Sequence, residues 1–409
     1  MSAVIVAVGN ELLRAGRRDT NAEWLAAELL GLGVVTTWRA AVEDDARRIA
    51  AIVRLARAGS EVVLLTGGLG PTEDDRTRDG LALALDRPLS RDPDMVAAIE
   101  RLFAARGRPF RPVQARQAER PAGTSWIPNP VGTAPGILDE ADGCLLAALP
   151  GVPAEMRAMF EATVRPRLRS RGTGAIAQRT LRIAGRPEAS VEEAVRDLYA
   201  TPLTDTTILA GSGLVDLVLT ATGRDRSEAV ARLEALEGAM RVRLTADVFG
   251  VDGDTLASAV GRLLAARGAT VAVAESCTGG GLGEAITEVP GASAWFRGGL
   301  VCYANDLKSS LADVPEETLG AFGAVSEETA RALAAGARRR CGATFGLGIT
   351  GIAGPTGGTP GKPVGTVHVA LADDGPGRAV RFVGPPDRAL VRRIAIVVAL
   401  DTLRRRLQS

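Results

Sequence analysis

Ser276 and Lys308, both in the last third of the chain, are the residue types with the most direct catalytic potential. Ser276 follows a short apolar run, Val271 to Ala274, and precedes three consecutive glycines. A hydroxyl at such a strand-to-helix turn lies beside the free N–H groups of a helix N-terminus, which can hold an oxyanion. Serine is a weak nucleophile that needs a base, and a desolvated lysine can serve where no suitable histidine is present. The pattern therefore indicates acyl-transfer chemistry by a serine and a lysine.

Both residues also have an ordinary structural interpretation. Ser276 would be an N-cap serine, and Lys308 would be a solvated surface lysine. Cys277 is a rival nucleophile because a thiolate is intrinsically more reactive than a hydroxyl. His368 is the single histidine, and its strand-like surroundings favour a structural role.

Several further segments accompany the serine turn in a fixed order. They are AESCTGG (274–280), GASAWFRGG (291–299), YANDLK (303–308), GAVSEETA (323–330), GITGIAGPTGG (348–358) and KPVGT (362–366). Together they resemble the C-terminal domain of the CinA family, whose stand-alone version is nicotinamide-nucleotide amidase. The resemblance implies hydrolysis of nicotinamide mononucleotide to nicotinate mononucleotide and ammonia, with no cofactor. It also implies that Ser276 is the nucleophile, Lys308 the base and Tyr303 an aid to proton transfer.

The substrate needs oxyanion donors and several donors for its ribose phosphate, and glycine-rich backbone and arginines are the usual source of the latter. We expect the N–H groups of Thr278 and Gly279 to form the oxyanion site, and Arg388 or Arg392 to reach the phosphate. The predicted substrate-binding residues are Thr278, Gly279, Gly280, Ser293, Asn305, Thr350, Gly351 and Arg388.

The first third of the chain carries a second set of motifs. Its main element is TGGLGPTEDD (66–75), which follows a buried strand and precedes a helix. Such a turn cradles phosphate, and its carboxylates can hold a hydrated divalent ion. With NPVGTAPG (129–136) and LPGVPAEM (149–156), the set resembles the CinA N-terminal domain, which is similar to the molybdopterin-binding fold of molybdenum-cofactor biosynthesis proteins. The resemblance implies metal-dependent ADP-ribose pyrophosphatase activity.

The residues that this resemblance singles out fall into two groups. The predicted metal ligands or base are Asp75, Asp74, Asp19 and Glu11, and the predicted nucleotide contacts are Gly67, Gly68, Gly70, Asn21, Asn129 and Thr133. The chain departs from the family pattern at Ala15, where a glycine is usual, and at Arg17-Arg18, where an apolar pair is usual. Alanine would be strained if that turn requires a positive φ. Binding of a nucleotide or pterin without cleavage is therefore the alternative.

The periodicity predicts an α/β protein with repeated βα units in its first and last parts and a small α+β segment between them. With the resemblance, these become a molybdopterin-binding-like three-layer domain (1–168), a small α+β linker or dimerisation domain (170–250) and an amidase-like domain (254–409). The first domain is expected to hold a mainly parallel sheet covered on both faces. Its pattern predicts a helix over 44–58 and a proline-rich loop over 109–135, and the middle segment predicts a strand over 242–246.

Composition excludes other classes of protein. The 409 residues carry a net charge of +1 with interspersed signs, so a nucleic-acid-binding face has little support. The triplets Arg338–Arg340 and Arg404–Arg406 are expected to stabilise helix C-termini. The apolar run 394–400 is too short to span a bilayer. Four cysteines without metal spacing, and an N-terminus without a charged leader, favour a reduced cytoplasm.

The resemblance also bears on partners and on other interpretations. It implies a homodimer that binds nicotinamide mononucleotide and ADP-ribose, with no nucleic-acid or membrane partner. Two alternatives remain: a regulatory, competence-associated binding protein, and a pterin-handling protein suggested by the fold of the first domain alone.

Overall fold

The computed structural model describes residues 1–14, 16–171, 174–199, 201 and 203–409, and these form two compact units. The first unit comprises Met1–Ala177 and Ala221–Arg232, and the second comprises Gln178–Thr220 and Leu233–Ser409. The fold is α/β, as predicted. None of the helices within the described ranges is long and apolar enough to cross a membrane.

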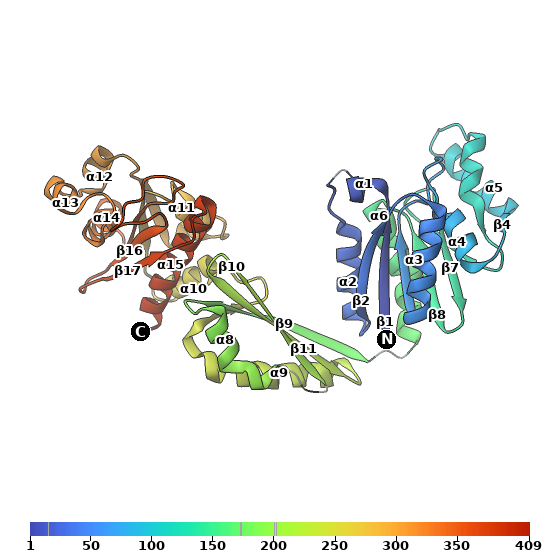
Figure 1. The fold of residues 1–409 in the computed structure, drawn as a ribbon, viewed down its shortest axis with the longest axis horizontal. Coiled ribbons are helices and arrows are strands. Elements are labelled where there is room, and N and C mark those ends of the chain that lie inside the picture. The colour runs from blue at the N-terminus through green and yellow to red at the C-terminus, as the bar shows by residue number, and fades with distance from the viewer. Residues whose placement is uncertain (15, 172–173, 200, 202) are drawn as a thin grey trace. The chain divides into compact units, whose positions relative to one another are not determined.

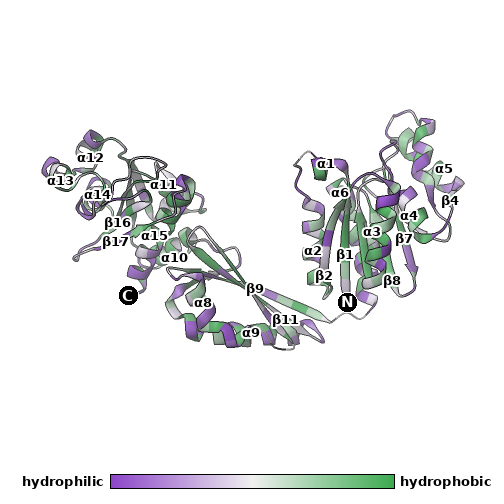
Figure 2. Cartoon of the chain, viewed as in Figure 1, coloured by the Kyte–Doolittle hydropathy of each residue, from purple (hydrophilic) through white to green (hydrophobic). Residues whose placement is uncertain are grey.

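A six-stranded sheet of order β2-β1-β3-β8-β7-β6 organises the first unit (Figure 1). Its strands are β1 (Ser2–Val8), β2 (Val35–Val42), β3 (Val62–Thr66), β6 (Ser125–Ile127), β7 (Gly136–Ala141) and β8 (Cys144–Leu149). The first four strands in this order are parallel to one another. β7 pairs antiparallel with β8, and β6 pairs antiparallel with β7. The central strands are apolar almost throughout (Figure 2), as expected where both faces are covered.

Helices cover both faces of this sheet. They are α1 (Asn10–Arg14), α2 (Thr20–Gly31), α3 (Ala46–Gly59), α4 (Thr77–Leu85), α5 (Pro93–Ala105), α6 (Pro153–Met159) and α7 (Arg165–Ser170), with a π-helical turn at Phe160–Val164. Leu25 of α2 and Phe160 share a core with Ile5, whereas Val53 of α3 shares the opposite core with Val6. Neighbouring residues of β1 therefore anchor opposite layers.

Two sequence-based expectations about local structure are wrong. The predicted loop over 109–135 contains a 3-10 helix, η1 (Pro112–Ala118), the strand β5 (Glu119–Pro121), which pairs with β4 (Leu89–Arg91), and β6. The predicted strand over 242–246 is the end of helix α9 (Arg226–Leu244) and a 3-10 turn. Val242 and Leu244 alternate with arginines as in a strand, but the buried Met240 and Leu244 follow the helical spacing.

The middle segment forms a four-stranded sheet of order β10-β11-β9-β12. Its strands are β9 (Ala175–Ala184), β10 (Thr204–Gly211), β11 (Leu214–Gly223) and β12 (Val248–Val251), and helix α8 (Glu188–Val195) follows β9. Burial alternates along β11, as expected where one face of a sheet is covered.

A five-stranded sheet of order β14-β13-β15-β16-β17 forms the last part of the chain. Its strands are β13 (Val271–Glu275), β14 (Phe296–Val301), β15 (Phe345–Gly351), β16 (Thr366–Ala372) and β17 (Arg378–Val383). The first three strands in this order are parallel to one another. β16 pairs antiparallel with β15, and β17 pairs antiparallel with β16. One face packs on α10 (Leu256–Ala266), α11 (Gly281–Thr287) and α15 (Arg388–Gln408), and the other on α12 (Asn305–Ala312), α13 (Glu316–Phe322) and α14 (Glu327–Cys341).

Candidate functional sites

Parallel pairing brings three predicted site segments to one edge of the C-terminal sheet. Glu275, the last residue of β13, pairs with Val301 of β14 and with Ile349 of β15. The residues that follow these strand ends therefore meet at the carboxyl edge. The N–H of Ser276 donates to the Ile349 carbonyl at 3.0 Å, so the ladder continues through the serine.

Strand alternation directs Ser276 toward the layer that carries Lys308. Ala272 and Ala274 face the core formed with α12 and α14, whereas Val271 and Val273 face the opposite core. Because side chains alternate along a strand, Ser276 falls on the α12 side and Cys277 on the other. Cys277 is indeed part of the opposite core.

Lys308 is buried, so its interpretation as a surface lysine is wrong. Only 2% of Lys308 is exposed, and its Nζ donates to the Tyr303 carbonyl at 2.8 Å. Burial lowers the pKa of this ammonium group, and the neighbouring Cys302, Cys277 and Asp306 oppose the shift. The amine is thus desolvated, and it lies near enough to Cys277 of the serine turn for the two groups to interact electrostatically.

Cys277 is poorly suited to be the nucleophile. Burial raises the pKa of its thiol to about 11, and the nearby Arg392 and Arg388 only partly offset this. The thiol is therefore protonated at neutral pH, and the thiolate is the reactive form.

Glu275 is a residue of this turn that the sequence analysis missed. Its carboxylate is 1% exposed and accepts the N–H groups of Leu282 at 2.9 Å and Gly283 at 2.8 Å. Both N–H groups belong to the first turn of α11. The sequence analysis expected the N–H groups of this helix N-terminus to be free for an oxyanion, but the Glu275 carboxylate occupies these two. The N–H of Gly279, predicted as an oxyanion donor, instead donates to the Ser276 carbonyl at 3.1 Å, which corrects that expectation.

Two arginines at the start of α15 reach the same loops. Arg388 donates to the Gly354 carbonyl at 2.8 Å and to the Tyr303 hydroxyl at 3.3 Å, and Arg392 donates to the Thr278 carbonyl at 2.7 Å. Arg388 thus holds the tyrosine, a contact that the expected phosphate role did not include. The Thr278 hydroxyl is buried and has no hydrogen-bond partner among the described residues.

The remaining predicted residues are distributed unevenly around this edge. Ser293 precedes β14 and lies at the amino end of the parallel strands, opposite Ser276, so the structure does not bring it to the site. The Thr350 hydroxyl is buried and donates to the Ala324 carbonyl at 2.6 Å. Gly280 has a φ of +96° at the start of α11, Gly351 packs on β16, and Asn305 is exposed in the first turn of α12.

His368 lies in strand β16, as expected, and opposes Thr350. It is two strands away from Ser276, a distance of about 10 Å. Burial and the neighbouring Arg381 and Lys362 lower its pKa. A histidine base for Ser276 is therefore not supported.

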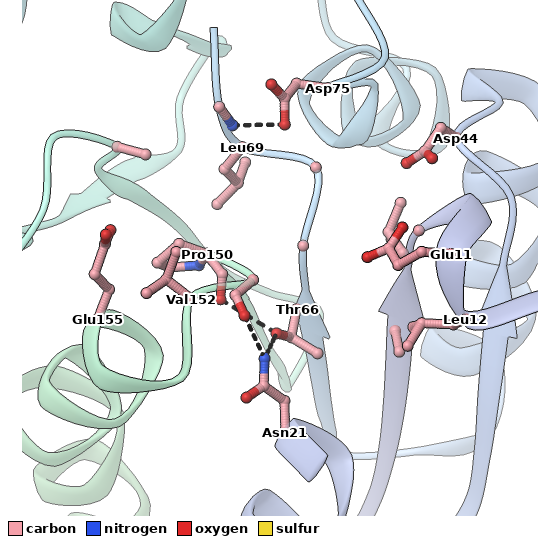
Figure 3. Close-up of a pocket in the computed structure, with 18 of the residues that line it drawn as sticks. Glu11, Leu12, Asn21, Asp44, Thr66, Leu69, Asp75, Pro150, Val152 and Glu155 are labelled. Atoms are coloured by element: carbon pink, nitrogen blue, oxygen red, sulfur yellow. Dashed lines mark hydrogen bonds between the residues drawn. The ribbon is translucent and has the colours of Figure 1, made fainter. Parts of the chain in front are cut away.

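The motifs of the first unit line a cavity of about 650 Å³ at the carboxyl ends of β1, β3 and β8 (Figure 3). The predicted residues that line it are Glu11, Asp19, Asn21, Gly67, Gly68, Gly70, Asp74, Asp75 and Thr133. Asn129 supports its wall, because its amide donates to Glu155 at 2.6 Å and to the Ala134 carbonyl at 2.9 Å. Figure 3 shows Glu155 on the side of the cavity opposite Glu11 and Asp44.

Hydrogen bonds already engage two of the four predicted metal ligands. Asp75 accepts the N–H of Gly70 and both the N–H and the hydroxyl of Thr72, all within 2.8 Å, and so orders the glycine-rich loop. Asp19 caps helix α2 by accepting the Ala22 N–H at 2.9 Å. Both carboxylates therefore have structural roles that the sequence analysis did not anticipate.

Asp44, like Glu155, is an acidic residue of this cavity that the sequence analysis missed. It lies before α3, although the pattern assigned it to a helix over 44–58. Burial raises the pKa of its carboxyl, and the neighbouring Glu11, Asp74 and Asp75 raise it further. No three His, Cys, Asp or Glu side chains are grouped to hold a metal ion in the portion of the chain that the structure describes. Glu11, Asp44 and Asp74 offer carboxylate oxygens, a ligand type that Mg²⁺ takes from proteins alongside waters and substrate phosphates.

The departure from the family pattern before α2 has a local explanation. Ala15 lies outside the described residues, but the next residue, Gly16, has a φ of +62°. A glycine one position later therefore adopts the left-handed conformation without steric cost. Arg17 and Arg18 line the cavity, where they add two cationic groups.

Comparison with known proteins assigns the family. Three family models match the chain: a probable molybdopterin binding domain over residues 4–170, a damage-inducible protein CinA KH domain over 178–250, and a CinA C-terminal domain over 253–407. A CinA-like protein of Gloeobacter violaceus is 45% identical over 409 residues, which are 99% of this chain and 96% of that protein. The chain belongs to the CinA family.

Other CinA relatives agree over the full length. A putative competence-damage inducible protein of Symbiobacterium thermophilum is 45% identical over 424 residues, which cover 99% of this chain and 98% of that protein. The protein CinA of Thermoplasma acidophilum, described as of unknown function, is 35% identical over 40% of this chain and 96% of its own, with a TM-score of 0.38.

Proposed function

We propose that this CinA-family protein hydrolyses nicotinamide mononucleotide to nicotinate mononucleotide and ammonia in its C-terminal domain, without a cofactor. The observation that carries the proposal is the burial of Lys308, whose pKa is lowered, on the sheet face toward which Ser276 is directed. A desolvated amine beside a serine hydroxyl is the arrangement that a Ser–Lys mechanism needs.

The chemistry proceeds in two stages. The Ser276 hydroxyl loses its proton to the neutral Lys308 amine, and its oxygen attacks the carboxamide carbon. The C–N bond then breaks, and the lysine returns the proton to the leaving nitrogen, which departs as ammonia. Water, deprotonated by the same lysine, attacks the acyl carbon; the bond to the Ser276 oxygen breaks, the lysine returns its proton to that oxygen, and the carboxylate product leaves. Tyr303, held by Arg388 at 3.3 Å, is available to assist the proton transfers.

Ser276→Ala is expected to lower ammonia release from nicotinamide mononucleotide by at least about 10³-fold, because the covalent route is lost. Cys277→Ala is the matched control and should retain the wild-type rate. Ammonia is measured with purified full-length protein in the presence of a metal chelator. Retained ammonia release in Ser276→Ala would exclude Ser276 as the nucleophile. Loss of ammonia release in Cys277→Ala alone would assign that role to Cys277.

We further propose that the N-terminal cavity binds ADP-ribose and cleaves its diphosphate with a divalent metal. The support is that the carboxylates of Glu11, Asp44 and Asp74 line the cavity beside a glycine-rich loop, where one or two of them would hold a hydrated ion together with the ligand's phosphates. A bound metal would polarise a phosphoryl oxygen, and the carboxylates would hold that metal. Binding of a nucleotide or pterin without cleavage is the alternative.

With Mg²⁺, wild-type protein is expected to convert ADP-ribose to AMP and ribose 5-phosphate. Asp44→Asn should slow this by about 10²-fold, the low end of the range for a catalytic carboxylate. Glu100→Gln, an exposed change on α5, is the control and should be neutral. If the wild-type protein binds ADP-ribose but forms no AMP with either Mg²⁺ or Mn²⁺, only the binding role of the cavity would remain.

The regulatory alternative makes a different prediction. KH folds bind single-stranded nucleic acid in other proteins, and a binding protein would show salt-sensitive affinity for it. The absence of a nucleic-acid or membrane partner, the homodimer and the cytoplasmic location remain predictions.

A further inference from the structure

The carboxylate of Glu275 differs from the other buried acidic side chains of the described chain. Asp139 and Asp401 are also buried, but each is paired with an arginine: Arg87 contacts Asp139 at 2.7 Å, and Arg405 contacts Asp401 at 2.7 Å. Glu275 is 1% exposed and forms no ion pair with any described residue. A buried carboxylate without a cation is costly to the fold, so its presence calls for an explanation.

Glu275 lies on the face of the sheet opposite Ser276. Because side chains alternate along β13, Glu275 shares the face of Val273, which packs in the core with α11. Its two oxygens accept the N–H groups of Leu282 at 2.9 Å and of Gly283 at 2.8 Å. The carboxylate therefore contacts the start of α11 and does not reach a substrate beside the serine hydroxyl.

These two hydrogen bonds anchor the far end of the turn that carries Ser276. The near end is held because the Ser276 N–H continues the strand ladder, and the middle is held by Arg392, which donates to the Thr278 carbonyl at 2.7 Å. Gly279 and Gly280 follow with φ of +57° and +96°. Two consecutive glycines give the backbone many alternative conformations, so the end of the turn needs an anchor of its own.

The chemistry of the anchor explains why a carboxylate is needed. Two adjacent N–H donors require two acceptors, and both oxygens of a carboxylate accept. A glutamine would offer one acceptor and turn its NH₂ donor toward the second N–H group. The N–H of Thr278, the other predicted oxyanion donor, has no acceptor within the described ranges, so the same anchor also sets the direction of this donor.

We propose that Glu275 is a positioning residue of the amidase site, which holds the turn so that the Ser276 hydroxyl faces the Lys308 layer and the Thr278 N–H faces the developing oxyanion. The inference rests on the proposed amidase function and adds to it a residue that touches neither the substrate nor the base. A misplacement of about 1 Å can cost about 10²-fold in rate, so an anchor on the far face of the sheet can control the reaction.

Two variants of the full-length protein test the anchor by the kinetics of ammonia release from nicotinamide mononucleotide. Glu275→Gln removes one acceptor and Glu275→Met removes both, and each keeps a similar side-chain length. We expect kcat to fall about tenfold in Glu275→Gln and about 10²-fold in Glu275→Met, with KM within about twofold of the wild-type value. The pH of half-maximal rate should not move, because it reports the lysine base. Glu284→Gln, which changes an exposed carboxylate in the first turn of α11, is the control and should keep wild-type kinetics.

A second readout measures the nucleophile without the nucleotide. The Ser276 oxygen displaces fluoride from the phosphorus of a fluorophosphonate, and the serine proton passes to Lys308. The mass of the intact protein follows this reaction, with Ser276→Ala as the blank. Labelling should slow about 10²-fold in Glu275→Met, as kcat does. Melting temperatures confirm that each variant is folded at the assay temperature.

The outcomes separate this inference from the amidase proposal. Wild-type rates in folded Glu275→Met would make the anchor structural only and overturn the inference. A rise in KM alone would place the effect on substrate binding, and a shifted pH of half-maximal rate would place it on Lys308; either result would overturn it as well. If the wild type releases no ammonia but fluorophosphonate labelling still depends on Glu275, the amidase proposal fails and the positioning role stands. Absence of both reactions in the wild type would overturn both.

Discussion

Lys308→Met is expected to reduce ammonia release by about 10²–10⁴-fold, the contribution of a general base, and to stabilise the fold at neutral pH. Methionine has a similar length, is apolar and adapts to irregular spaces. Lys308 is 2% exposed, and burial disfavours its charged form. The wild-type fold therefore carries the cost of a desolvated ammonium group whenever the lysine is protonated.

The sign of the pH dependence follows from the lowered pKa. The folded-state pKa of Lys308 lies below the value of 10.5 for an ordinary lysine, so between these two values the unfolded state binds more protons than the folded state. The free energy of unfolding of the wild type therefore rises with pH across this window. The stability advantage of Lys308→Met is then largest below the lowered pKa and shrinks as the pH approaches 10.5.

Melting temperatures from neutral to alkaline pH measure this effect. Lys362→Met is the stability control, because Lys362 also donates to a backbone carbonyl, that of Phe322 at 2.9 Å, but is only half-buried. It should show no comparable gain. The wild-type rate of ammonia release should rise with pH through the lowered pKa, because only the neutral amine accepts a proton. Full activity in Lys308→Met would remove the lysine from the mechanism.

The sequence predicted the regular elements around these sites well, because their signals are local. The glycine-rich loop follows the buried strand β3 and precedes α4, and the serine turn follows β13, both as expected. The burial of Lys308 was not predictable, because it depends on how α12 packs beside Cys302, which is a tertiary contact. The position of Ser293 also depends on tertiary structure. Its motif begins before β14, and that strand runs from the amino edge of the sheet to the edge that carries Ser276, so the start of the motif lies far from the serine turn.

The acidic residues show where motif-based prediction is limited. The resemblance predicts Asp75 and Asp19 as metal ligands, and the spacing of Asp75 from Thr72 and of Asp19 from Ala22 is also typical of turns and caps. The sequence therefore carries a structural signal at both positions in addition to the motif. Asp44 and Glu275 were missed because their neighbours in space, Glu11 and the α11 amides, become visible only once the strands are paired.

Asp401→Asn is expected to have the largest effect on stability, a loss of about 3–5 kcal/mol, which is typical when a buried ion pair loses one partner. Arg404 is fully buried, and its Nε donates to Asp401 at 2.9 Å. The prediction that the triplet Arg404–Arg406 stabilises a helix terminus is thus wrong for Arg404, whose guanidinium also donates to the Ala246 carbonyl at 2.7 Å. Without the carboxylate, a buried cation would keep only neutral partners.

Urea unfolding measures the loss, with an unchanged slope indicating an intact native state. Glu327→Gln breaks the exposed pair with Arg331 at 2.8 Å and should cost less than about 1 kcal/mol. The double variant Asp401→Leu/Arg404→Met should recover most of the stability, because replacing a buried pair by apolar groups is often neutral. A loss below about 1 kcal/mol in Asp401→Asn would contradict the argument. Since α15 also carries Arg388 and Arg392 to the loops around Ser276, ammonia release should fall in Asp401→Asn and return in the double variant.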